Sequence, residues 1–290
     1  ALDLGMPVAI NLSIGDTYGA HDGTSLLEQY IDSVSGNGRN VICIGAGNEA
    51  VANGHTSFVP YVQERIELSV AAGERSTNVQ IWKNYVDTCE IQLVAPNGER
   101  FVLDMQKIGM QEWRMGNTQV LIYISPPKPY SVNEEVFFDF IADEEYIDSG
   151  IWSFIITPVS SSQHDYHMFL PGTAVRNSAT RFLEPTPELT MTIPAFARSA
   201  LTVGAYNTAT GGYADFSGRD RVMGEENRLF FATKSKPDIV APGVEIVAPS
   251  VRGGYESFSG TSFATPLVTG SAALLMEWGI VRGNDPFLFG

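Results

Sequence analysis

The stretch that decides the fold is G-T-S-F-A-T-P-L-V-T-G-S-A-A-L-L-M, residues 260–276. It places Ser262 between a Gly-Thr turn and a run of small and apolar residues, which predicts a buried helix. Pro266 falls about one turn into that helix, near where a missing N–H costs least. The first N–H groups of a helix lack intrahelical acceptors and carry the positive end of its dipole. A serine there suits a nucleophile whose attack creates an oxyanion, although Gly-Thr-Ser is also ordinary N-cap composition.

The length and composition are those of a globular protein with one large domain or two ordinary ones. The 290 residues are 44% hydrophobic and 18% charged, and the net charge is −15. This acidic balance argues against nucleic-acid binding, which needs a basic surface. No run of about 18 apolar residues stands out, so we expect no membrane span. Two cysteines, Cys43 and Cys89, are too few for a disulfide framework. Cysteine usage therefore does not indicate the cellular compartment of the protein.

Both ends of the chain resemble cut ends, which favours the hypothesis that it is a piece of a longer protein. Residues 1–7 lack the basic segment and apolar core of a secretory signal, and they resemble the end of a helix that leads into a strand. Residues 284–290 stop without a terminal helix or strand. We therefore expect sequence on either side of this chain.

The first part of the chain predicts a βαβ unit. Residues 8–15 are typical of a strand that ends in a glycine turn, and residues 25–34 have apolar side chains at helical spacing. Residues 40–45 form a short, continuously apolar strand. Parallel strands of this kind are buried on both faces, so we expect an α/β fold here.

The pattern changes between about residues 61 and 171. Helical periodicity disappears, and short alternating segments separated by turn residues indicate antiparallel strands. The segments are 64–70, 78–82, 90–94, 119–124, 135–140 and 150–156. Six or more such strands predict a β-sandwich or jelly roll, and we interpret residues 59–189 as an inserted all-β domain. Apolar strands at 200–205 and 236–243 then resume the α/β pattern, so residues 1–58 and 190–290 would form the other domain.

A second candidate site residue is Asn48. It lies in G-A-G-N-E, residues 45–49, directly after the apolar strand 41–44. Ligands gather at the carboxyl ends of strands in open parallel sheets, and glycines allow close backbone approach. The Asn48 amide could thus donate into a cleft, but a plain glycine-asparagine turn would have the same composition.

Taken together, these segments resemble the subtilisin-like serine proteases (subtilases, the S8 family). Residues 260–266 match the nucleophile signature G-T-S-x-A-[ST]-P, and 237–243 match the D-x-x-A-P-G turn. Residues 10–15 are similar to the strand that lines the S1 pocket, and 45–49 to the oxyanion segment A-x-G-N. The resemblance covers about 1–58 and 190–282. It implies the C-terminal part of a subtilisin-like parallel-sheet sandwich, interrupted by the all-β insertion.

The resemblance implies hydrolysis of peptide bonds in protein substrates through an acyl-enzyme. Ser262 would be the nucleophile and Asn48 an oxyanion donor. The residues implied in substrate binding are Ser13, Ile14, Gly15, Ala46, Gly47 and Glu49. No cofactor is required. Calcium sites are frequent in the family, but no oxygen-ligand loop here is convincing.

The place of the insertion, residues 19–23 and residues 275–280 are similar to clostridial germination-type subtilases, which carry a jelly-roll insertion. That resemblance implies a secreted protein or one associated with the spore or cell envelope.

The base and the orienting carboxylate of a serine protease are not evident. In subtilases they lie in D-[ST]-G and H-G-T motifs that precede the S1 strand, and this chain begins at about that strand. His21 in H-D-G-T follows the strand instead, so we reject it as the base, and we interpret Asp22 and Thr24 as caps of the next helix. We interpret His55, His164 and His167 as surface or loop residues.

We therefore expect an endopeptidase whose N-terminal part, a partner of this piece, supplies the base, and we expect the piece alone to be inactive or very weak. One alternative is a pseudoprotease that senses or binds through the same cleft. Another is a glycan-binding protein in which Trp82, Trp113 and Trp152 of the insertion form a platform, although strand positions make Trp82 and Trp152 better core residues.

Overall fold

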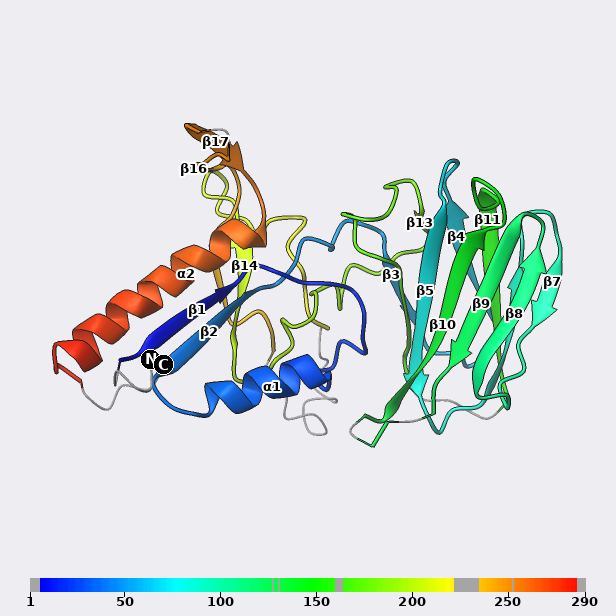
Figure 1. The fold of residues 1–290 in the computed structure, drawn as a ribbon, viewed down its shortest axis with the longest axis horizontal. Helices are drawn as coiled ribbons and strands as arrows, with labels where there is room; N and C mark the ends of the chain where they lie inside the picture. Colours follow the sequence, from blue (N-terminus) through cyan, green and yellow to red (C-terminus); the bar gives the residue numbers. More distant parts are fainter. Residues whose placement is uncertain are drawn as a thin grey trace. The chain divides into compact units, whose positions relative to one another are not determined.

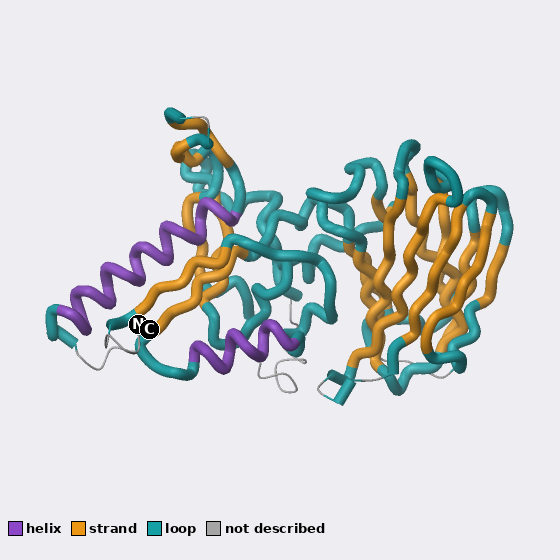
Figure 2. The backbone as a smooth tube through the Cα atoms, viewed as in Figure 1, coloured by secondary structure: helices purple, strands orange, loops and turns teal. Residues whose placement is uncertain are grey.

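The computed structural model describes residues 6–126, 128–129, 131–159, 164–221, 235–251 and 253–285. The chain folds into two compact units, Ala1–Val51 with Glu188–Gly290, and Ala52–Pro187. We call them the parallel unit and the antiparallel unit, after their sheets. Figure 2 shows that both of the long helices belong to the parallel unit.

The parallel unit is built on a four-stranded sheet with the order β1-β2-β14-β15, in which all strands are parallel (Figure 1). Its strands are β1 (Val8–Leu12), β2 (Asn40–Gly45), β14 (Leu201–Tyr206) and β15 (Ile239–Pro242). A two-stranded hairpin follows, formed by β16 (Ile246–Pro249) and β17 (Tyr255–Phe258). The expected βαβ unit is present, because helix α1 (Leu26–Ser35) connects β1 to β2.

Helix α1 begins with a capping box rather than with the predicted caps. The Ser25 hydroxyl accepts the N–H of Glu28, and the Glu28 carboxylate accepts the N–H of Ser25. Asp22 instead accepts hydrogen bonds from the backbone and the hydroxyl of Thr24. The prediction that Asp22 and Thr24 cap the helix is therefore wrong, because their bonds close a turn that lies before it.

Helix α2 (Thr261–Met276) contacts all four parallel strands and continues into a π-helical turn, η3 (Glu277–Val281). Several apolar side chains on its other side are exposed, among them Leu267, Leu274, Leu275 and Trp278. Within the described ranges, Thr261–Val281 is apolar and long enough to cross a membrane by length and composition, with a mean hydropathy of 1.3. The expectation of no membrane span is thus not confirmed, although a core helix passes the same test.

The antiparallel unit consists of two sheets. The six-stranded sheet has the order β3-β12-β5-β10-β9-β8, and the five-stranded sheet has the order β13-β4-β11-β6-β7. The first contains β3 (His55–Phe58), β5 (Ser76–Asn84), β8 (Gly109–Met115), β9 (Thr118–Ile124), β10 (Asn133–Ala142) and β12 (Tyr166–Phe169). The second contains β4 (Glu64–Val70), β6 (Cys89–Val94), β7 (Arg100–Val102), β11 (Gly150–Pro158) and β13 (Arg181–Phe182).

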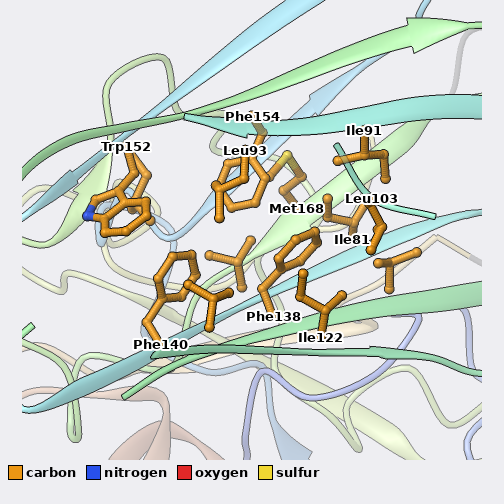
Figure 3. Packing of buried hydrophobic residues seen from close by; sticks show 14 of the residues in the cluster. Ile81, Ile91, Leu93, Leu103, Ile122, Phe138, Phe140, Trp152, Phe154 and Met168 are labelled. Atoms are coloured by element: carbon orange, nitrogen blue, oxygen red, sulfur yellow. The ribbon is translucent and has the colours of Figure 1, made fainter. Parts of the chain in front are cut away.

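Large side chains from both sheets fill one core between them (Figure 3). Phe138 meets Phe154 edge to face with ring centroids 5.1 Å apart, and Phe140 meets Trp152 at 5.0 Å. Such edge-to-face pairs contribute beyond the area that they bury. The alternation in the sequence thus corresponds to strands with one face in this core, while the jelly-roll topology stays a prediction.

Two histidines of the antiparallel unit differ from their sequence interpretation. His55 in β3 and His167 in β12 are 3% and 9% exposed, and their rings stack with centroids 5.4 Å apart. The interpretation of both as surface or loop residues is wrong, because β3 pairs with β12 and places the rings together. For the same reason residues 52–58 group with the antiparallel unit.

Candidate active site

Ser262 is the second residue of α2, and Gly260 is the N-cap. Among the described residues, neither the Ser262 hydroxyl nor its backbone N–H has a hydrogen-bond partner. An N–H in the first turn of a helix has no intrahelical acceptor, so this group remains able to bind an anion. The serine is half-buried at the helix terminus, with a donor next to its own hydroxyl.

Asn48 is attached to the same helix terminus through its side-chain oxygen. Its Oδ1 accepts the backbone N–H of Thr261 at 2.9 Å and the Thr261 hydroxyl at 3.2 Å. Because the oxygen is engaged in this way, the Asn48 Nδ2 group is left as a donor, and it has no acceptor among the described residues. The sequence predicted a donor role for Asn48, and this geometry shows what orients it.

Two neighbours make that arrangement possible. The hydroxyl of Thr261, a residue only 2% exposed, also accepts the N–H of Gly47 at 3.1 Å, so it joins the end of β2 to the helix. Gly260 has a φ of 151°, and a Cβ there would lie 3.3 Å from Nδ2 of Asn48. A side chain at position 260 would press on the Asn48 amide, and its backbone angle also favours glycine.

Ser13 reaches the nucleophile through a hydrogen bond that Pro266 makes possible. Pro266 has no N–H, so the carbonyl of Ser262, four residues earlier, lacks its helical donor. The Ser13 hydroxyl donates to that carbonyl at 3.1 Å, and Asn11 Nδ2 donates to the Ser13 hydroxyl at 2.9 Å. The strand predicted to bind substrate is therefore hydrogen-bonded to the helix that carries Ser262.

The other residues predicted to bind substrate differ in their exposure. Ile14 is 63% exposed, whereas Ala46 is fully buried. Gly15 is exposed, and Gly47 and Glu49 are half-buried. Gly15 and Gly47 both lie against the side chain of Thr192. Of the candidate site residues on these two segments, Ile14, Gly15 and Asn48 are therefore the exposed ones, and Ala46 is buried.

His21 is not placed as a general base. It is 4% exposed, and its ring nitrogens lie 2.9 Å from the Met191 carbonyl and 3.2 Å from the Thr17 carbonyl. Burial lowers the pKa of His21 to about 4, because desolvation disfavours the charged ring. This environment gives a physical reason, beyond its place in the chain, to set His21 aside.

No set of metal ligands can be named within the described ranges, since no three His, Cys, Asp or Glu side chains gather there. One buried ammonium group lies between oxygens instead. Lys236 Nζ donates to the Ala200 carbonyl and to Asp238, each at 2.6 Å. The parallel unit thus contains a buried ion pair between Lys236 and Asp238.

Two residues that the sequence did not point to, Thr261 and Thr192, also belong to this region. Thr261 is part of the nucleophile motif itself, but its bonds to Gly47 and Asn48 span more than 200 residues of chain. No local sequence pattern marks Thr192 as a site residue, because it lies in the long loop between β13 and β14. Only the folded chain brings it beside Gly15 and Gly47.

The chain is similar to known proteases. The family model described as "Subtilase family" matches residues 172–280. Subtilisin of Bacillus pumilus is 34% identical over 88 residues, 30% of this chain and 26% of that protein. A PII-type proteinase of Lactococcus lactis subsp. cremoris is 46% identical over 52 residues, 18% of this chain and 3% of that protein.

A solved structure, that of the Clostridium perfringens CspB protease, matches this chain over its whole length. The TM-score is 0.88 and the identity 31%, and the match covers 100% of this chain and 59% of the CspB chain. The chain therefore spans about three fifths of that protease and about a quarter of the Bacillus pumilus subtilisin.

Proposed function

Because these comparisons confirm the resemblance to the subtilase family, we propose that the full-length protein is a serine endopeptidase with Ser262 as its nucleophile. The Ser262 hydroxyl attacks a peptide carbonyl, and a tetrahedral oxyanion forms. The amine product then departs, and water hydrolyses the acyl-enzyme that remains. The substrates are proteins or peptides.

One observation carries this proposal. The Asn48 amide is bonded through its oxygen to the N–H of Thr261, and this directs its free donor to the helix terminus that holds Ser262. The Ser262 backbone N–H is a second donor there without an acceptor among the described residues. An oxyanion that develops beside a nucleophile is stabilised by hydrogen-bond donors that are already in position before the reaction.

The base and its orienting carboxylate would come from a further segment of the protease domain, N-terminal to residue 1. Two features of the parallel unit support such a segment. β1 is an edge strand of the four-stranded sheet, so one of its edges can pair with another strand. Helix α2 exposes Leu274 and Leu275, 68% and 53%, and an apolar face of this kind is normally covered.

The presence of both Ser262 and Asn48 favours an active enzyme over a pseudoprotease, which needs neither group. The glycan-binding alternative is weakened for two of its three tryptophans. Trp152 is fully buried in the core and Trp82 is 6% exposed, while Trp113 is 45% exposed and stacks on Phe101. A single half-exposed tryptophan makes a poor platform.

Labelling with a fluorophosphonate probe tests the proposal. The full-length protein should react at Ser262 and cleave a casein substrate, and Ser262→Ala should lose both activities, by about 10⁶-fold in kcat. The matched control is Ser271→Ala on the exposed side of the same helix, which should keep both.

The 290-residue chain alone should react with the probe far more slowly, since it lacks the base. Labelling of this piece as fast as the full-length protein would show that the base lies within it and would overturn that part of the proposal. A full-length protein that is folded but neither labelled nor proteolytic would instead support the pseudoprotease.

A further inference from the structure

Strand β8 is the last strand of the six-stranded sheet, and among the described residues only β9 pairs with it (Figure 1). The two strands pair without interruption from Gly109 to Met115. Natural sheets usually protect such an edge with proline, lysine, a bulge or a very short strand. β8 has seven residues, contains no proline or lysine, and has no bulge in its register with β9. An unprotected edge of this length is able to pair with another strand.

Exposed apolar side chains accompany this edge. Met110 and Trp113 of β8 are 54% and 45% exposed, and Ile108, just before the strand, is 62% exposed. The Trp113 ring stacks on Phe101 of β7 with centroids 4.4 Å apart. Since β7 is the edge strand of the five-stranded sheet, the edges of both sheets meet at this aromatic pair. Apolar surface gathered in this way favours an interface.

The hairpin at the end of β8 determines which backbone groups reach the open edge. The two-residue turn Gly116-Asn117 joins β8 to β9, and the φ of 60° at its glycine is that of a type II′ hairpin. Met115 and Thr118 flank this turn and therefore form a hydrogen-bonded pair. Because bonded and non-bonded pairs alternate along the ladder, Glu112 and Arg114 direct their N–H and carbonyl groups to the open edge. Outside the pairing with β9, no described residue bonds these groups.

The sequence of β8 is complementary to itself in one antiparallel register. When two copies pair about a two-fold axis at Trp113, Glu112 of each copy lies opposite Arg114 of the other. Both side chains are on the same, exposed face, because residues two apart in a strand share a face. Opposite charges and aromatic rings at directly opposed positions stabilise a strand pair. If the axis lay at Glu112 or at Arg114 instead, like charges would face each other.

Within one copy these two charges have only weak partners. Gln119 Nε2 donates to Glu112 Oε1 at 2.7 Å, and Arg114 Nη1 lies 3.3 Å from Asp143 Oδ2. The Arg114 side chain is 64% exposed, and exposed pairs contribute little to stability. Glu112 keeps its second carboxylate oxygen, and Arg114 keeps its other N–H groups, for a partner across the edge.

We infer that β8 is a self-association surface of this protein. Two copies pair β8 with β8 in antiparallel fashion about Trp113, and their six-stranded sheets join into one continuous sheet. The partner is a second copy because the order of the charges is complementary to itself. A two-fold interface uses the same strand on both sides, so association stops at the dimer. The inference does not depend on the proposed peptidase activity.

Sedimentation velocity of the full-length protein over a series of concentrations tests this inference, and the wild type should form a concentration-dependent dimer. Arg114→Glu and Glu112→Arg each make both charge pairs repulsive. Each should therefore raise the dissociation constant of the dimer about tenfold or more. The matched control is Arg65→Glu, which makes the same charge change at an exposed residue of β4, a strand with neighbours on both sides. It should leave the dissociation constant unchanged.

A mixture of the two variants separates pairing at β8 from a loss of folding. Glu112→Arg mixed with Arg114→Glu should dimerise again, because opposite charges then face each other across the edge. Recovery in the mixture, with weak association of each variant alone, would support the register about Trp113. A wild type that stays monomeric at its highest soluble concentration would overturn the inference, as would a dimer that neither variant weakens or that the mixture does not restore.

Discussion

The two units of this chain bury different kinds of side chains. The core of the antiparallel unit contains large residues such as Phe138, Phe154 and Trp152, all fully buried. The parallel unit also buries larger side chains such as Ile42, Ile44 and Phe196, but the cluster between α2 and its sheet consists mostly of alanines, with Cys43 and Val203. Since stabilisation by burial grows with apolar area, the antiparallel unit gains much more from its own core.

They also differ in what they leave open. The parallel unit has an exposed apolar helix face, and its donors at Ser262 and Asn48 have no acceptor among the described residues. The antiparallel unit encloses its large side chains between two sheets. On the proposed function, the reacting groups belong to the parallel unit, and its open donors and exposed apolar face would serve a substrate and a further segment.

The largest expected effect tests the core between the two sheets of the antiparallel unit. Phe154→Ala should lower the free energy of unfolding by about 3–5 kcal/mol, because it leaves a cavity among rings that cannot collapse fully. Urea unfolding followed by tryptophan fluorescence measures this. Val175→Ala, at a residue 77% exposed, is the control and should stay within about 0.5 kcal/mol. A loss below about 1 kcal/mol for Phe154→Ala would contradict a tightly packed core.

The next effect tests whether the open donor at Asn48 serves catalysis rather than folding. Asn48→Ala should lower kcat of the full-length protein about 10²- to 10³-fold with little change in KM, because the donor acts on the transition state. Its stability should fall by only about 1 kcal/mol, from loss of the Oδ1 bonds to Thr261, which is too little to unfold the protein in the assay. Asn37→Ala, in an exposed turn, is the control. A rise in KM with kcat unchanged would indicate a substrate-binding role instead.

Thr261 gives a way to sharpen that result. Thr261→Val removes the hydroxyl that bonds Gly47 and Asn48, so part of the same loss in kcat is expected. Because Thr261 acts through Asn48, the double variant should lose about as much as Asn48→Ala alone. Additive losses would show that the two residues act independently.

A third effect concerns the one buried histidine of the parallel unit that the structure describes. The pKa of His21 is lowered from 6.5 to about 4, so the unfolded chain binds a proton more readily between these values. Above about pH 6.5 His21 is neutral in both states and does not lower the stability. As the pH falls from 6.5 to 4, protonation of the unfolded chain lowers the free energy of unfolding by up to about 3 kcal/mol. His21→Asn, which tolerates the local φ of 52°, should remove this slope. Parallel pH profiles of both proteins would refute the assignment.

The smallest effect expected in the 290-residue chain itself tests the open face of α2. In the 290-residue chain, Leu274→Ala should change stability by no more than about 0.5 kcal/mol, because the side chain is 68% exposed. In the full-length protein it should cost about 2–5 kcal/mol if a further segment covers it. Leu26→Ala on α1, 65% exposed, should be nearly neutral in both. Neutral behaviour of Leu274→Ala in both proteins would leave this face uncovered.

Much of the fold could be predicted because burial leaves a period in the sequence. The alternation at 135–140 and 150–156 corresponds to β10 and β11, each with one face in the core. β8 could not be predicted in this way, since only Gln111 and Met115 of its residues are buried. Nor could β12, because it is short and buried throughout, and its strand character depends on pairing with β3 and β5.

The sequence by itself determined the candidates for the proposed chemistry: the Ser262 motif, the Asn48 segment and the segment around Ser13, since each is a short stretch with a local pattern. Only the tertiary structure decided how they are held. The Thr261 bond to Asn48, the Ser13 hydroxyl on the carbonyl that Pro266 leaves without a donor, and Thr192 between two glycines join residues far apart in the chain. Hydrogen bonds and steric contacts of this kind depend on distances in space, and no local pattern in a sequence encodes them.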